Sequence, residues 1–136
     1  MLGNSYWHEL KIPILAHKVA AQEWEKHGHG SLNSMKGYNL EKADKTTVQG
    51  PTEVFEKKRE IKLGRFTINV LWLGLSHSPG DVVVHLPSQN LVISGDMAFH
   101  ERLLPVMADT QTEGWLESWE RFEELNADYV IPGHGH

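Results

Sequence analysis

The sequence predicts a mixed α+β fold, in which a mixed β-sheet is flanked by helices. Short apolar segments in the middle of the chain come in pairs joined by tight turns, and segments with helical spacing precede and follow them. Strands joined by tight turns are antiparallel, which argues against a doubly wound parallel sheet. A chain of 136 residues is the length of one domain, so we expect a single domain over residues 1–136.

The N-terminal part predicts a helix, a strand and a second helix, followed by a loop. Residues 4–11 have the spacing of a short helix, and the apolar residues 12–16 predict a buried strand. Residues 18–26 have helical composition, and we expect His27-Gly28-His29-Gly30 to end that helix. The polar, weakly periodic residues 31–51 predict a long surface loop.

Two hairpins are predicted in the middle of the chain. Residues 53–63 and 65–73 form the first, with its turn at Leu63-Gly64, and residues 82–86 and 91–94 form the second. The arms are rich in Val, Ile and Leu, as expected for strands that pack against a core.

The C-terminal part predicts one amphipathic helix and a last short strand. Thr110 and Glu113 have the spacing of a capping box, which predicts the start of the helix. The apolar stripe that we expect to pack in the core consists of Trp115, Leu116, Trp119, Phe122 and Leu125. Residues 129–131 predict the strand.

Charge and composition exclude several classes of partner. The formal net charge is -5, and the one basic run, Lys57-Lys58-Arg59, is flanked by Glu56 and Glu60, so we expect no nucleic-acid partner. No stretch has the length and apolarity of a membrane span, and we expect no membrane partner. The N-terminal residues do not resemble a signal peptide, which favours the cytoplasm. Without cysteines, a metal ion would need His and carboxylate ligands.

Candidate ligands of that kind follow three predicted strands. In each case an apolar run ends, a small residue follows, and His77, Asp96 or His134 comes next. Each alone is more often an ordinary loop residue, but their joint occurrence at strand ends favours a shared site. If the strands run in one direction, the three side chains converge at one sheet edge. Imidazole and carboxylate ligands suit zinc, with manganese or iron as alternatives.

The motifs around these residues resemble the later motifs of the metallo-β-lactamase superfamily. They are His77-Ser78-Pro79-Gly80-Asp81, Ser94-Gly95-Asp96 and Pro132-Gly133-His134-Gly135. The resemblance implies an αββα sandwich with one or two zinc ions at a sheet edge. It implies that His77 binds the first metal, Asp96 bridges both and His134 binds the second, while Asp81 orders its loop.

The family's His-x-His-x-Asp-His motif does not occur in these 136 residues, so we expect an incomplete, C-terminal part of that sandwich. His27-Gly28-His29 has part of the spacing, but we expect it to lie at an exposed helix end. The resemblance implies a metal-dependent hydrolase that uses activated water on a small-molecule ester, amide or lactam, here with low activity. The alternative is a non-catalytic remnant that acts as an oligomeric or partner-binding protein. In both cases uncovered apolar surface predicts a homo-oligomer.

Overall fold

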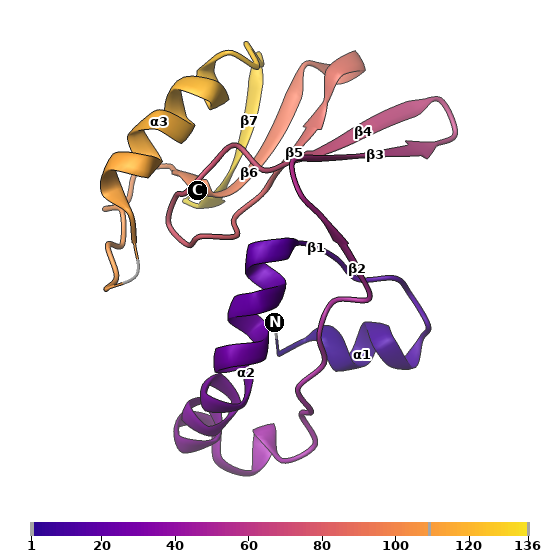
Figure 1. Cartoon of the computed structure of the whole chain (residues 1–136), viewed down its shortest axis with the longest axis vertical. Helices are drawn as coiled ribbons and strands as arrows, with labels where there is room; N and C mark the ends of the chain where they lie inside the picture. The colour runs from indigo at the N-terminus through magenta and orange to yellow at the C-terminus, as the bar shows by residue number, and fades with distance from the viewer. Residues whose placement is uncertain (1, 109, 136) are drawn as a thin grey trace. The chain divides into compact units, whose positions relative to one another are not determined.

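The computed structural model describes residues 2–108 and 110–135, and the chain forms two compact units, Met1–Phe55 and Glu56–His136 (Figure 1). Whether the chain is one domain stays a prediction. The elements of the first unit are α1 (Asn4–Glu9), β1 (Leu15–His17), α2 (Lys18–Asn39), the 3-10 turn η1 (Leu40–Ala43) and β2 (Glu53–Phe55). β1 and β2 pair in parallel as a two-stranded sheet.

Helix α2 is much longer than the sequence predicts. It does not end at its glycines but continues to Asn39, so the predicted loop over residues 31–51 is helical in its first part. The reason is tertiary packing at Gly28, which is buried. A Cβ added there would lie 2.9 Å from Val48 Cγ1 and 3.3 Å from the indole nitrogen of Trp24. This close approach suits glycine, and packing of this kind outweighs its weak helix propensity.

The second unit contains a five-stranded sheet with one helix. Its elements are β3 (Lys58–Leu63), β4 (Phe66–Leu71), β5 (Val83–Leu86), the 3-10 turn η2 (Pro87–Gln89), β6 (Leu91–Phe99), α3 (Thr112–Glu123) and β7 (Tyr129–His134). The strand order is β3-β4-β5-β6-β7, with antiparallel neighbours except for the parallel pair of β6 and β7. The α+β class and both hairpins are confirmed. Residues 53–55, expected in the first hairpin, instead form β2 in the other sheet.

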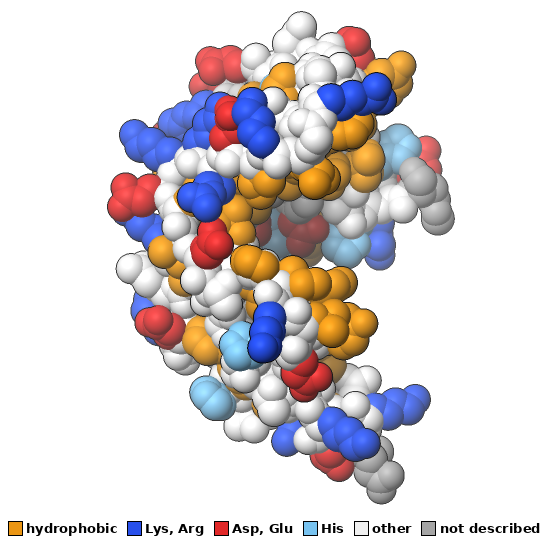
Figure 2. Space-filling model, turned by 90° about the vertical axis from the view of Figure 1, so that its right-hand side faces the viewer, with side chains coloured by type: hydrophobic (Ala, Val, Ile, Leu, Met, Phe, Trp, Pro, Cys, Tyr) orange, Lys and Arg blue, Asp and Glu red, His pale blue; other side chains and the backbone are white. Residues whose placement is uncertain are grey.

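The core of the second unit lies between the sheet and α3. It is a cluster of buried apolar side chains, namely Val83, Val92, Met97, Trp115 and Phe122. Ile93 on β6 and Ile131 on β7 are cross-strand neighbours, and both are exposed. Exposed hydrophobic side chains also appear among intermixed acidic and basic residues in Figure 2.

Two expectations for α3 are wrong in part. Trp115 and Phe122 are buried, but Leu116 is 70% exposed and Trp119 37% exposed. The buried face instead includes Ser118, whose hydroxyl donates to the carbonyl of Leu75 at 2.7 Å. The predicted capping box is absent, because α3 begins at Thr112 with no side-chain cap.

Within residues 2–108 and 110–135, no helix is both long enough and apolar enough to cross a bilayer.

Candidate metal centre

Asp96 lies in β6, where the strand's pairing with β7 becomes irregular. The register shifts on both sides of Gly95, which has a left-handed backbone with φ of 52°. Across the strand pair, a Cβ on Gly133 would overlap Asp96 Oδ1 and the backbone of Gly95. Glycine at 133 therefore lets β7 pass directly beside the carboxylate. The side chain of Asp96 keeps 34% of its surface exposed, so the carboxylate stays accessible.

His134 occupies the last position of β7 and faces this carboxylate. Its Nε2 atom lies 3.3 Å from Asp96 Oδ1. The imidazole stacks on the ring of Phe99, with 5.1 Å between ring centroids and 15° between planes. The backbone N–H of His100 donates to the carbonyl of His134 at 2.9 Å, which holds the strand end in place.

His77 approaches Asp96 from the loop between β4 and β5. Its Nε2 atom lies 3.9 Å from Asp96 Oδ2, and its Nδ1 atom lies 3.0 Å from the carbonyl oxygen of Pro105. When Nδ1–H donates to that carbonyl, a neutral ring turns its Nε2 lone pair toward the carboxylate. A lone pair facing a carboxylate oxygen is favourable only with a cation or a proton between them.

The loop that carries His77 is ordered by Asp81, as the sequence predicts. Asp81 accepts hydrogen bonds from the Ser76 hydroxyl at 3.0 Å and from the backbone N–H of Ser78 at 2.6 Å. The Ser78 hydroxyl also donates to it. Thr110, expected in the capping box, donates its hydroxyl to the carbonyl of His77 at 3.0 Å. Side chains from both flanks therefore hold the imidazole in position.

The structure thus brings together all three residues that the sequence singled out. Two imidazole nitrogens and one carboxylate are a donor set that suits zinc. Asp96 presents one oxygen to each histidine, so the donors form two pairs that share the carboxylate. Within the part of the chain that the structure describes, no group of three or more such side chains is arranged around one point as ligands of a single ion. The assignment of the three residues as metal ligands stays a prediction.

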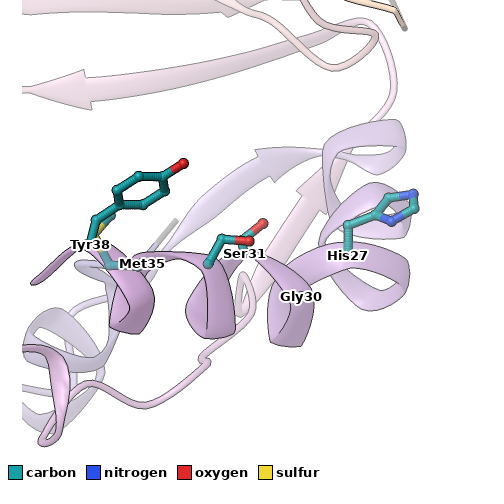
Figure 3. Close-up of a pocket in the computed structure, with 6 residues that line it drawn as sticks. His27, Gly30, Ser31, Met35 and Tyr38 are labelled. Carbon is teal, nitrogen blue, oxygen red and sulfur yellow. The ribbon is translucent and has the colours of Figure 1, made fainter. Parts of the chain in front are cut away.

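The other histidines differ in their surroundings. His27 and His29 are exposed, as expected, but they lie within α2 and not at its end; Figure 3 shows His27 on this helix. His100 is exposed, with Nε2 3.8 Å from Glu101 Oε1. Burial, and secondarily the charge of Lys58, lower the pKa of His85. His136 lies outside the described residues.

His17, a histidine outside the three predicted ligands, is buried. It is 1% exposed, and its Nδ1 accepts a hydrogen bond from the backbone N–H of Val19 at 3.4 Å. Its ring meets that of Phe55 edge to face at 5.7 Å. Like the three predicted ligands, His17 follows an apolar run that ends in a small residue, Ala16.

Comparison with known proteins identifies the family. The family model described as the metallo-beta-lactamase superfamily matches residues 4–134, and the chain belongs to this superfamily. It is 25% identical over 89 residues to the metallo-beta-lactamase type 2 of Bacteroides fragilis, a match that covers 62% of this chain and 36% of that protein.

Solved structures show the same fold. A metallo-beta-lactamase from Pontibacter korlensis superposes with a TM-score of 0.75 at 20% identity, covering 98% of this chain and 55% of that one. The metallo-beta-lactamase IND-7 gives a TM-score of 0.75 at 19% identity, covering 97% of this chain and 54% of that one. The chain therefore spans about half the length of these solved relatives, and about a third of the Bacteroides fragilis protein.

Proposed function

We propose that this chain acts as a metal-dependent hydrolase of a small-molecule ester, amide or lactam. One observation carries the proposal: His77 and His134 each turn Nε2 toward a different oxygen of Asp96, at 3.9 and 3.3 Å. Membership of the superfamily and the β-lactamases among its solved relatives favour the lactam and ester chemistry. The acidic net charge of -5 favours a small molecule over a nucleic acid as substrate.

The three side chains would hold one or two zinc ions, or manganese or iron in their place. Asp96 would contribute one oxygen to each of two ions, His77 would bind one and His134 the other. A bound divalent ion lowers the pKa of water and polarises the carbonyl of the substrate. The carbonyl of Pro105 orients the His77 ring, and the stacked ring of Phe99 orients His134. Contacts of this kind raise the affinity of a metal site.

We expect low affinity and low activity for this chain. A catalytic zinc ion usually has three protein ligands and one open position. The described residues offer each ion one histidine and a share of Asp96. With only two protein ligands, an ion dissociates readily, and imprecise positioning costs orders of magnitude in rate.

The experiment measures zinc content and affinity first, then hydrolysis of nitrocefin and p-nitrophenyl acetate with added zinc or manganese. Asp96→Asn should lower zinc affinity by about tenfold or more and remove any metal-dependent turnover. Asp128→Asn, at an exposed acidic position between α3 and β7, is the matched control and should change neither. Equal zinc binding by the Asp96→Asn variant and the unsubstituted chain would refute the proposed site.

A second candidate function is that of an oligomeric, non-catalytic protein. Its support is the apolar surface around β7, the edge strand, where Tyr129 is 65% exposed, Val130 43% and Ile131 48%. An exposed apolar edge strand favours pairing with another chain. A second copy would cover it in a homo-oligomer. Sedimentation at micromolar concentration should show at least a dimer, and Ile131→Lys should shift it toward monomer. A folded, unsubstituted monomer would contradict this candidate.

A further inference from the structure

The second unit has an apolar pocket beside α3 that the hydrolase chemistry does not use. Its volume is about 500 Å³, within the range of small-molecule sites. It lies between α3, the end of β6 and the segment that leads from β6 to α3. The side chains that define it include Phe99, Arg102, Leu104, Trp115, Leu116 and Trp119.

Two indole rings form a preorganised wall of this pocket. Trp115 is 7% exposed, and its indole N–H donates to the carbonyl of Met97 at 3.2 Å. Trp119 stacks on the ring of Phe122, with centroids 5.0 Å apart and planes at 26°. Because neighbouring groups already hold both rings, a ligand would lose little affinity to side-chain ordering.

Two of the aliphatic side chains that line the pocket, Leu104 and Leu116, meet water. Leu104 is 53% exposed and Leu116 is 70% exposed. Leu116 belongs to the α3 stripe that the sequence assigns to the core, yet it lies outside the buried face of the helix. An apolar side chain in that place is available to cover a ring that enters the pocket.

Arg102 supplies the charge. It is the single charged residue among the described residues that line the pocket, and it is exposed in a chain of net charge -5. A guanidinium group pairs with carboxylates and sulfonates and also stacks on aromatic rings. The combination of indole wall, aliphatic rim and one cation matches an aromatic ring that carries an acidic group.

We propose that this pocket binds small aromatic anions. The site is separate from the Asp96 centre but shares its supporting side chains. The centroid of the Trp115 ring lies 6.0 Å from that of His77, and Phe99 stacks on His134. A ligand in the pocket therefore contacts two side chains that pack against the histidines. Binding needs no metal ion, so the inference goes beyond the proposed hydrolase and does not depend on it.

The test titrates the chain with anilinonaphthalenesulfonate in the presence of EDTA and follows dye fluorescence. Leu116→Glu should raise the dissociation constant by about tenfold, because it places a carboxylate at the apolar rim. Arg102→Gln should raise it about two- to fivefold, as expected for loss of one exposed ion pair.

The matched controls are Leu63→Glu and Arg65→Gln at the turn between β3 and β4, far along the sheet from α3. Leu63 is 64% exposed, close to the exposure of Leu116, and both variants should bind the dye as the unsubstituted chain does. Equal weakening by Leu63→Glu and Leu116→Glu would overturn the proposal, because the dye would then be binding apolar surface in general.

Two further outcomes would also overturn it. The neutral dye N-phenylnaphthylamine should bind the Arg102→Gln variant and the unsubstituted chain equally well. If anilinonaphthalenesulfonate also binds both equally well, the pocket does not select anions.

Sedimentation of the same variants tests whether a second copy of the chain occupies the pocket. If Leu116→Glu turns a dimer into a monomer and the dye competes with the dimer, the pocket is a self-association surface. Loss of zinc binding without loss of dye binding would count against the hydrolase alone.

Discussion

The two units of the chain differ in their internal packing. In Glu56–His136, five buried hydrophobic side chains form one cluster between the sheet and α3, whereas the described part of Met1–Phe55 buries Leu32, Ala43 and Phe55. The first unit relies instead on individual close contacts, such as Trp24 over Gly28 and Gly50. A continuous core follows from an alternating sequence pattern, but such single contacts do not. The difference explains why sequence reasoning works well for one unit and poorly for the other.

The largest expected effect is on the free energy of unfolding, when an aromatic ring is removed from the core of the second unit. Phe122 is 8% exposed within the apolar cluster, and Phe122→Ala should lower the free energy of unfolding by about 3–5 kcal/mol. Leu116→Ala on the same helix, at a position 70% exposed, should cost less than about 1 kcal/mol. Urea unfolding measures both. Equal losses would show that the two faces of α3 do not differ in burial.

The next effect tests the close packing beside the carboxylate. Gly133→Ala places a methyl group against Asp96 Oδ1 and the Gly95 backbone, which must move apart. We expect a loss of about 1–3 kcal/mol in the free energy of unfolding, together with weaker zinc binding. Urea unfolding and zinc titration measure the two effects. If the variant were destabilised but bound zinc with unchanged affinity, the close packing at Gly133 would matter for stability and not for zinc binding by Asp96.

A smaller effect, of opposite sign, comes from the first unit. A Cβ on Gly30 in α2 meets nothing within 4 Å, so Gly30→Ala should stabilise the protein by about 0.5–1 kcal/mol. Gly28→Ala in the same helix should destabilise, because its Cβ would press on Val48 and Trp24. Thermal unfolding monitored by circular dichroism measures both. Stabilisation by both substitutions would mean that Trp24 does not pack over Gly28.

The residues of the candidate site could be predicted from the sequence because each follows a run of apolar residues. His77, Asp96 and His134 come after apolar runs, and the mixed sheet brings the ends of those runs to one edge. The supporting contacts could not be predicted. The carbonyl of Pro105, 28 positions along the chain from His77, contacts its Nδ1 atom. No residue pattern in the sequence indicates which backbone carbonyl will face an imidazole. Thr110 satisfied a capping pattern by spacing alone, yet it bonds to the loop of His77.

The fold shows the same division. Both hairpins were predicted, because apolar runs flank tight-turn residues in each. The bounds were less accurate: β3 begins at Lys58 and not at residue 53, and β6 continues to Phe99, beyond the predicted residue 94. The extension of α2 to Asn39 was missed, since glycines at 28 and 30 indicate a helix end unless their packing is known. Leu116 was assigned to the core because helical spacing gives the direction of a stripe but not the width of the surface that the sheet covers.

The smallest expected effect lies on the sheet of the second unit, where burial is partial. His85 on β5 is half-buried, and its pKa is lowered from about 6.5, first by burial and then by the charge of Lys58. The neutral form is therefore favoured in the folded state. As pH falls through about 6.5, the unfolded chain takes up the proton first. Stability that this residue contributes above that pH should decline until the folded pKa is passed.

Lys58→Gln separates the two causes, since it removes the cation and leaves the burial. NMR titration of the imidazole C–H signals measures the pKa of His85. In Lys58→Gln this pKa should rise but stay below its ordinary value, because burial is the larger cause. Arg65→Gln removes a cation at the β3–β4 turn and should leave the titration unchanged. A full return to the ordinary pKa in Lys58→Gln would show that the ring of His85 is as well hydrated as in the unfolded chain. That result would contradict the partial burial of His85 on β5. The difference in burial between the core under α3 and the rest of the sheet would then be larger than the structure indicates.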